Sequence, residues 1–163
     1  MTARTDLVAV ALAATLAAAP VLAADPPPVP YPAGYRSWTH VKTMQILEGH
    51  PLFASFGGIH HLYANPKAMQ GYRSDRFPDG AVIVFDLLAP VNADHTVTDG
   101  NRKVVGVMHK DAKRYAATGG WGFEGFKGDS RTERAVGANA KGACFGCHEP
   151  QRGRDYVFSA WKE

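Results

Sequence analysis

The pentapeptide CFGCH, from Cys144 to His148, constrains this chain more than any other feature of its sequence. A Cys-x-x-Cys-His motif is typical of the attachment site of c-type haem. The spacing lets both thiols bond to the vinyl groups of one porphyrin, and the histidine that follows supplies the proximal imidazole of the iron. Cys144 and Cys147 are the only two cysteines, so neither has another thiol to pair with. The motif therefore predicts one haem c, attached through both cysteines and ligated by His148.

Three other interpretations of the motif are weaker. A redox-active cysteine pair normally lies near a βαβ pattern and works through a lowered thiol pKa, and no such pattern surrounds Cys144. A structural zinc site needs four ligands, and no second ligand pair is evident. A disulfide between the two cysteines is sterically possible in an exported protein, but it gives the histidine no role. Haem attachment is the interpretation that uses all three residues.

Residues 1–24 are expected to form a cleavable secretory signal peptide. Arg4 precedes an apolar, alanine-rich core from Leu7 to Ala19, and small residues before Asp25 offer cleavage after Ala23 or Ala24. This core is too short to span a bilayer, which takes about 20 residues. Because c-type haem is attached outside the cytoplasm, the signal and the motif agree, and we expect a periplasmic protein without a membrane span after processing.

The remaining chain is long enough for one domain with one core. Residues 25–34, which include PPPVPYP, are expected to form a stiff leader, and residues 35–163 the haem-binding domain. The formal net charge is +3. Since the basic residues are scattered rather than clustered, the charge gives no indication of a nucleic-acid partner.

Short apolar runs that are rich in β-branched residues predict a sheet. The runs at 81–88 and 103–108 are predicted to be the strands of a long hairpin, with Asp99-Gly100 as a turn before the second strand and Pro78 to Gly80 as a turn before the first. Further strands are expected at 37–47, 58–63 and 121–126.

Three short helices are expected among these strands. The first has Asn65 as its N-cap and Pro66 at its first position, and the second begins at Asp111. The third follows the haem motif, where Tyr156, Val157, Ala160 and Trp161 would share a face. The predicted fold class is therefore α+β, mainly antiparallel sheet with a few short helices. A four-helix bundle is excluded, because it needs four long helices with apolar residues at a period of 3.6.

At this level of detail the chain resembles the cytochrome P-460 family, and within it most closely the cytochromes c'-beta. The resemblance covers nearly the whole chain from Tyr35 onwards. It is carried by the stretches YRSWTHVK (35–42), FGGIHHLYAN (56–65), GYRSDRFPDGAVIVFDLL (71–88), KDAKRYAATGGWGFEGF (110–126), ACFGCH (143–148) and DYVFSAW (155–161).

The resemblance implies a mainly antiparallel β protein, usually a homodimer, that holds one haem c with five-coordinate iron. In the cytochromes P-460 proper, a lysine on the strand after FPDG is bonded to the porphyrin, and those proteins oxidise hydroxylamine. Phe85 stands at the matching position here, so this cross-link cannot form there. The cytochromes c'-beta have phenylalanine at that position and a second phenylalanine over the open face of the iron, and Phe56 matches the second.

Two phenyl rings over the iron would exclude water and offer no hydrogen bond. Bound dioxygen gains from a hydrogen-bond donor, whereas nitric oxide and carbon monoxide bind well without one, so the resemblance implies a protein that binds NO and CO and scavenges NO. An unidentified periplasmic electron donor or acceptor is expected as a further partner. The alternative is an oxidoreductase that oxidises hydroxylamine or NO.

A simple electron-transfer cytochrome is the third hypothesis. It would need a sixth iron ligand, and the candidates are His60, His61, Met44, Met69 and Met108. Adjacent residues of a strand point to opposite faces, so at most one of the two histidines can face the haem. The sequence shows no recognisable methionine-ligand loop, and this hypothesis ranks last.

Overall fold

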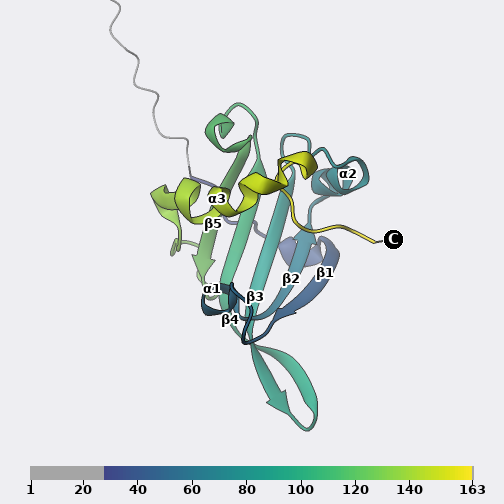
Figure 1. Cartoon of the computed structure of the whole chain (residues 1–163), viewed down its shortest axis with the longest axis vertical. Coiled ribbons are helices and arrows are strands. Elements are labelled where there is room, and N and C mark those ends of the chain that lie inside the picture. Colours follow the sequence, from purple (N-terminus) through teal and green to yellow (C-terminus); the bar gives the residue numbers. More distant parts are fainter. Residues whose placement is uncertain (1–27, 163) are drawn as a thin grey trace, which may run out of the picture.

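The computed structural model of the protein describes residues 28–162, and the predicted signal peptide lies outside this range. Its centre is one five-stranded antiparallel sheet with the strand order β1-β2-β3-β4-β5 (Figure 1). The strands are β1 (Thr39–Ile46), β2 (Gly58–Ala64), β3 (Val82–Ala93), β4 (Thr96–Lys110) and β5 (Trp121–Lys127). Each strand pairs with its neighbour in the sequence, which confirms the predicted α+β class. No helix of residues 28–162 is long and apolar enough to cross a membrane.

The predicted hairpin of β3 and β4 is confirmed, but its turn lies elsewhere. Asp94 and His95 both have positive φ, 48° and 60°, and form a two-residue loop between the paired residues Ala93 and Thr96. This is the geometry of a tight hairpin turn that follows the twist of its strands. Asp99 and Gly100 lie inside β4, next to an irregularity in the register. The loop end of the hairpin projects beyond the rest of the sheet (Figure 1).

The predicted helix after Asn65 is confirmed as α2 (Pro66–Ser74). The Asn65 side chain accepts a hydrogen bond from the N–H of Ala68 at 2.8 Å, which satisfies one of the free donors of the first turn. Ala68 and Met69 are buried. A short helix that the sequence did not predict, α1 (Phe53–Phe56), precedes β2.

The other two helix predictions were wrong. After Asp111 there is a turn and then only a short 3-10 helix, η2 (Ala116–Thr118), because Gly119 and Gly120 both take positive φ and end it. The helix near the haem motif includes the motif instead of following it. Asp155 and Tyr156 also take positive φ, 49° and 66°, so the chain leaves the helix there and residues 157–162 have no regular structure.

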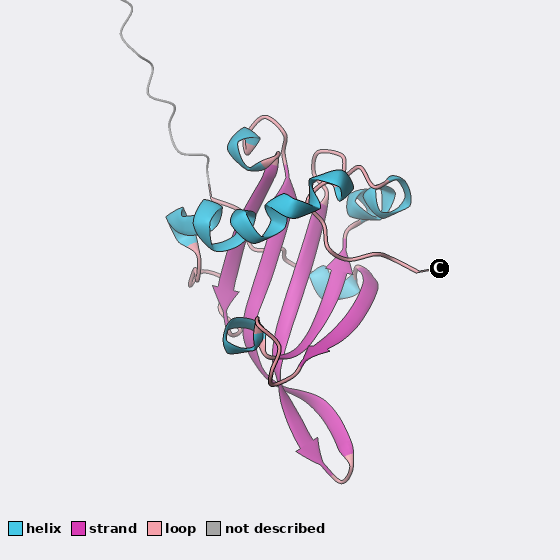
Figure 2. Ribbon diagram, in the orientation of Figure 1, coloured by secondary structure: helices cyan, strands magenta, loops and turns pink. Residues whose placement is uncertain are grey.

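We call the part that contains the motif the C-terminal helical segment. It consists of η3 (Gly137–Asn139), η4 (Lys141–Phe145), α3 (Gly146–His148) and η5 (Glu149–Arg154). The segment crosses one face of the sheet, and α1 lies on the same side nearer the projecting hairpin (Figure 2). We call this the front face. Ile83, Phe85 and Leu87 alternate along β3 with Val84 and Asp86, which point to the back face.

Both faces carry a core. The front core lies between the sheet, α2 and the C-terminal helical segment, and contains Val41, Ala64, Ala68, Met69, Phe77, Ala81, Ile83, Trp121, Phe123, Phe145 and Val157. The back core contains Val29, Tyr35, Val84, Val105, Val107, Tyr115 and Phe126. Val29 shows that the described part of the proline-rich leader packs against the sheet. Arg134 strengthens this contact by donating to the carbonyl of Val29 at 2.8 Å.

Candidate haem site

The C-terminal helical segment is fixed to the front face through Phe145, the residue that follows Cys144. Phe145 is buried, and its ring lies 6.3 Å from that of Phe123 on β5 and 5.4 Å from that of Tyr156. With Phe145 anchored in the core, Cys144 is half-buried against it and Cys147 is exposed, and the two thiols are not joined in a disulfide. The motif therefore lies along the edge of the front core.

Burial raises the pKa of the Cys144 thiol to about 11, and the nearby carboxylate of Glu124 adds to this effect. A redox-active cysteine works as a thiolate and needs a lowered pKa. At this pKa the Cys144 thiol is protonated at neutral pH, and the charge of Glu124 that acts on it is negative. This geometry disfavours the redox interpretation of the motif.

His148 is held in one orientation and one tautomer. Its Nδ1 lies 2.8 Å from the carbonyl oxygen of Tyr156, and because a carbonyl can only accept, Nδ1 carries the proton. The imidazole ring packs against Phe123 at 5.1 Å and Phe158 at 4.9 Å between ring centroids. Burial lowers the pKa of His148, which favours the neutral ring. Its Nε2 therefore keeps a lone pair, as a proximal iron ligand requires.

Phe56 and Phe85, the two predicted capping residues, are in contact. Phe56 ends α1, Phe85 lies in the middle of β3 on the front face, and their rings meet edge to face with centroids 5.8 Å apart. Phe56 is 37% exposed and Phe85 is half-buried, so neither ring is fully packed inside the core. Their rings form an apolar surface on the same face of the sheet as His148.

A strip of glycine backbone separates these two parts of the site. Phe85 pairs with Gly106 on β4, and Gly106 pairs with Gly125 on β5, two residues from Phe123. A Cβ on Gly106 would project beside the Phe85 side chain at 3.4 Å, so a larger residue would fill the front face there. The two glycines paired in the row beside Phe85 carry no side chain, so little bulk stands there between the phenylalanine and β5, which suits a planar ligand.

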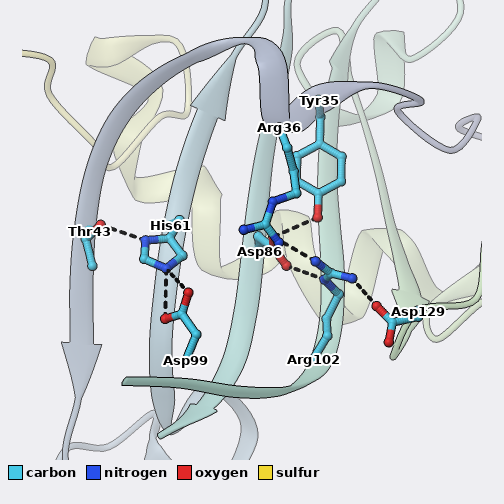
Figure 3. A network of polar contacts seen from close by, with 8 residues as sticks. All are labelled: Tyr35, Arg36, Thr43, His61, Asp86, Asp99, Arg102 and Asp129. Carbon is cyan, nitrogen blue, oxygen red and sulfur yellow. Dashed lines mark hydrogen bonds and ion pairs between the residues drawn. The ribbon is translucent and has the colours of Figure 1, made fainter. Parts of the chain in front are cut away.

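His60 is the histidine that faces the front, as the alternation of β2 requires. It is 1% exposed, its ring lies 4.5 Å from that of Phe85, and its Nδ1 has no hydrogen-bond partner within residues 28–162. Burial, His61 and Lys42 lower the pKa of His60 to about 4, so it is neutral at neutral pH. His61 points to the back face, where it contacts Thr43 and Asp99 (Figure 3).

The three methionines considered as iron ligands lie in different places. Met69 is buried in α2 as part of the front core, Met44 is 46% exposed on β1, and Met108 is half-buried on β4 against the front core. Met44 pairs with His60 across β1 and β2, so it too lies on the front face. Packing accounts for Met69 and Met108.

A polar network surrounds Asp86, the residue that follows Phe85 on β3 and points to the back face (Figure 3). The fully buried carboxylate of Asp86 accepts hydrogen bonds from Arg102 at 2.6 Å and from the Tyr35 hydroxyl at 2.7 Å. Burial and Asp86 raise the pKa of Tyr35. Arg102 also pairs with Asp129. This network fixes the backbone of β3 where Phe85 projects to the other face.

The register irregularity in β4 decides which faces of the sheet Arg102 and Lys103 point to. Leu87 pairs with Val104 and Leu88 with Arg102, so Lys103 is the extra residue of a bulge. Arg102 reaches Asp86, whereas the Lys103 ammonium donates to the carbonyl of Gly57 at 2.8 Å and holds the end of α1. Sequence reasoning missed Lys103, as well as the contact of His60 with Phe85, because bulges and cross-strand neighbours leave no local signal.

These residues fit a haem. The donor set offers one neutral imidazole with a free Nε2, two thiols within one turn of it, and an apolar, glycine-lined sheet face opposite aromatic rings. Fold and site together are those of a haem-binding protein built on an antiparallel sheet. The family model described as Cytochrome P460 matches residues 32–159, and the chain belongs to this cytochrome family. A search of curated proteins found none that matches the chain.

Proposed function

We propose that this cytochrome is a periplasmic protein of the c'-beta type that binds nitric oxide and carbon monoxide at a five-coordinate haem c, and that it scavenges NO. The observation that carries the proposal is the contact between Phe56 and Phe85, with ring centroids 5.8 Å apart, on the face of the sheet that also holds His148. It is an apolar cap at the position where cross-linked relatives carry lysine.

The residues of the chain have separate roles in this proposal. Cys144 and Cys147 would attach the haem, and Nε2 of His148 would hold its iron. When bound, the haem supplies an iron that takes up a diatomic gas on its open side. Phe56 and Phe85 exclude water from that side and donate no hydrogen bond, which disfavours dioxygen relative to NO. The Lys103 bond to Gly57 keeps α1, and with it Phe56, over the sheet.

Electronic spectra of the purified protein test the proposal. The reduced protein is expected to be high-spin and five-coordinate, and to change its spectrum when NO or CO is added. A low-spin, six-coordinate reduced spectrum that NO does not alter would overturn it. Retention of the haem in acidified acetone, and its loss in a Cys144→Ser, Cys147→Ser double variant, tests the covalent attachment.

A second candidate function is the oxidation of hydroxylamine or NO. The observation in its favour is His60, a buried neutral imidazole that contacts Phe85. Its Nδ1 has no hydrogen-bond partner among the described residues, so this nitrogen is open to a proton from a substrate. Hydroxylamine is added to the oxidised protein together with an electron acceptor. Turnover that disappears in a His60→Leu variant would support the enzyme, and a third haem bond to a lysine in peptide mass spectra would do so too.

The proposal also includes a homodimer and a periplasmic redox partner. The dimer is supported by membership of the family, whose proteins are usually dimers. The periplasmic location is supported by the signal-like residues 1–24. Sedimentation of the purified protein tests the first point. Fractionation of cells that express the full chain tests the export.

A further inference from the structure

A buried ion pair between Lys110 and Asp155 joins the turn that orients His148 to the end of β4. The carbonyl that accepts from His148 belongs to Tyr156, and Asp155 and Tyr156 both have left-handed backbone conformations, with φ of 49° and 66°. Such conformations are unfavourable for residues other than glycine, especially for a bulky one such as Tyr156, and persist only where the surroundings fix them. The direction of this carbonyl therefore depends on whatever holds Asp155.

Three other parts of the chain bind Asp155. Its carboxylate accepts from the Lys110 ammonium at 2.6 Å and from the backbone N–H of Phe77 at 2.9 Å. Its carbonyl accepts from the indole of Trp121 at 2.8 Å. The side chains of Lys110 and Asp155 are each only 10% exposed, so the pair is shielded from water. A shielded, charge-assisted hydrogen bond is stronger than an exposed one.

The Lys110 ammonium has further contacts that keep it in place. It donates to the carbonyl of Gly119 at 3.1 Å and lies 5.0 Å from the ring centroid of Trp121. Gly119 is also where the Tyr156 ring rests, since a Cβ at Gly119 would lie 2.2 Å from that ring. Lys110, at the end of β4, thus binds Asp155 directly. It also binds Gly119, against which the Tyr156 ring packs.

We infer that Lys110 and Asp155 are positioning residues for the proximal histidine, which set the strength of the Nδ1–H hydrogen bond from His148 to Tyr156 and so tune the iron bound at Nε2. The inference rests on the proposed ligation of iron by His148. A hydrogen bond donated from Nδ1 makes the imidazole a stronger electron donor, which strengthens its bond to iron and stabilises the oxidised state. Neither residue touches the haem ligand; both act through the Tyr156 carbonyl.

The test compares the wild type with Asp155→Asn and Lys110→Met, using full-length haem-loaded protein. Both variants are expected to lower the iron–histidine stretching frequency in the resonance Raman spectrum of the reduced protein and to raise its reduction potential. Lys110→Arg, which keeps the charge and the donor, is expected to restore both values toward the wild type. Lys110→Met serves as the second variant if Asp155→Asn does not fold.

Asp86→Asn is the matched control. It removes a charge that is buried even more completely, at 0% exposure against 10% for Asp155, but lies on the back face. It should therefore destabilise the fold without moving the iron–histidine band. Unchanged frequency and potential in both Asp155→Asn and Lys110→Met would overturn the inference, as would an equal shift in Asp86→Asn. A wild type without an iron–histidine band would overturn the ligation by His148 and the inference with it. Failure to bind NO in a wild type that shows the band would overturn only the proposed function.

Discussion

Arg102 donates through Nε to Oδ1 of Asp86 at 2.6 Å, and this buried pair lies on the back of the strand position that presents Phe85 to the front. Two adjacent residues of β3 thus serve two faces of the sheet. Asp86 anchors the strand through Arg102 and Tyr35, and Phe85 contributes to the apolar cap. The stability of the cap side of the site therefore depends on a charge pair that does not contact the site.

Removal of one partner of this pair should be costly. Asp86→Ala leaves the Arg102 guanidinium and the Tyr35 hydroxyl without their buried acceptor, and we expect the free energy of unfolding to fall by about 3 kcal/mol. Urea denaturation followed by circular dichroism measures this. The control is Glu133→Ala, which removes an ion pair with Lys127 that is more than half exposed on both sides and should cost less than about 1 kcal/mol. Equal losses in the two variants would contradict the prediction.

Phe85→Val should open the capped side of the site. Valine keeps the position apolar and favours a strand, but it removes the ring that meets Phe56. We expect the association rate of CO with the reduced protein to rise by about tenfold, which corresponds to a barrier lower by about 1.4 kcal/mol. Flash photolysis or stopped flow measures the rate. The control is Phe53→Ala. Phe53 is an exposed residue of α1, the helix that carries Phe56, and its loss should leave the rate near the wild-type value.

The buried His60 predicts a loss of stability in acid. The folded state holds the pKa of His60 at about 4, below the ordinary value of 6.5, so between these pH values the unfolded chain binds the proton more readily. Stability then falls as the pH is lowered through this window, by up to on the order of 3 kcal/mol for this one group. Denaturation at several pH values should show a smaller fall in His60→Leu than in the wild type. The same fall in both proteins would assign the effect to other groups.

A comparison of alanine variants at two glycines distinguishes the cost of backbone strain from the cost of a steric clash. Gly119 and Gly34 have similar positive φ, 65° and 74°, but a Cβ on Gly119 would lie 2.2 Å from the Tyr156 ring, whereas a Cβ on Gly34 would meet nothing within 4 Å. Gly34→Ala should cost about 1 kcal/mol for the backbone alone, and Gly119→Ala roughly 1 to 3 kcal/mol more. Thermal or urea unfolding measures both. Only Gly119→Ala should also lower the iron–histidine frequency, because only it displaces Tyr156.

Haem attachment through two thioethers can be checked on peptides. A digest is expected to place the haem on the peptide that contains Cys144 and Cys147, and on no lysine. No lysine adduct is expected because Phe85, which has no nucleophilic side chain, stands at the position of the cross-link in the related enzymes. A haem adduct on Lys103, the bulge residue whose ammonium reaches Gly57, or on Lys42 would show that another front-face lysine replaces the missing one.

The sequence alone determined the local features. The β-branched runs, the Asn65 cap and the CFGCH pentapeptide depend on neighbouring residues, and the strands, α2 and the family followed from them. The turn at Asp94 and His95 and the end of the helix at Asp155 were missed, because aspartate, histidine and tyrosine at positive φ carry no signal comparable to glycine. In both cases the long-range pairing of the chain decided the conformation.

The tertiary structure alone decided which distant residues act together. Phe56 meets Phe85 only because α1 folds back over β3, and Asp155 reaches Lys110 only because the C-terminal helical segment returns to the end of β4. The bulge that turns Arg102 to the back face and Lys103 to the front is a property of strand register. Motifs name the groups that can bind haem, whereas burial and register set the direction of His148 and the apolar surface on its side of the sheet.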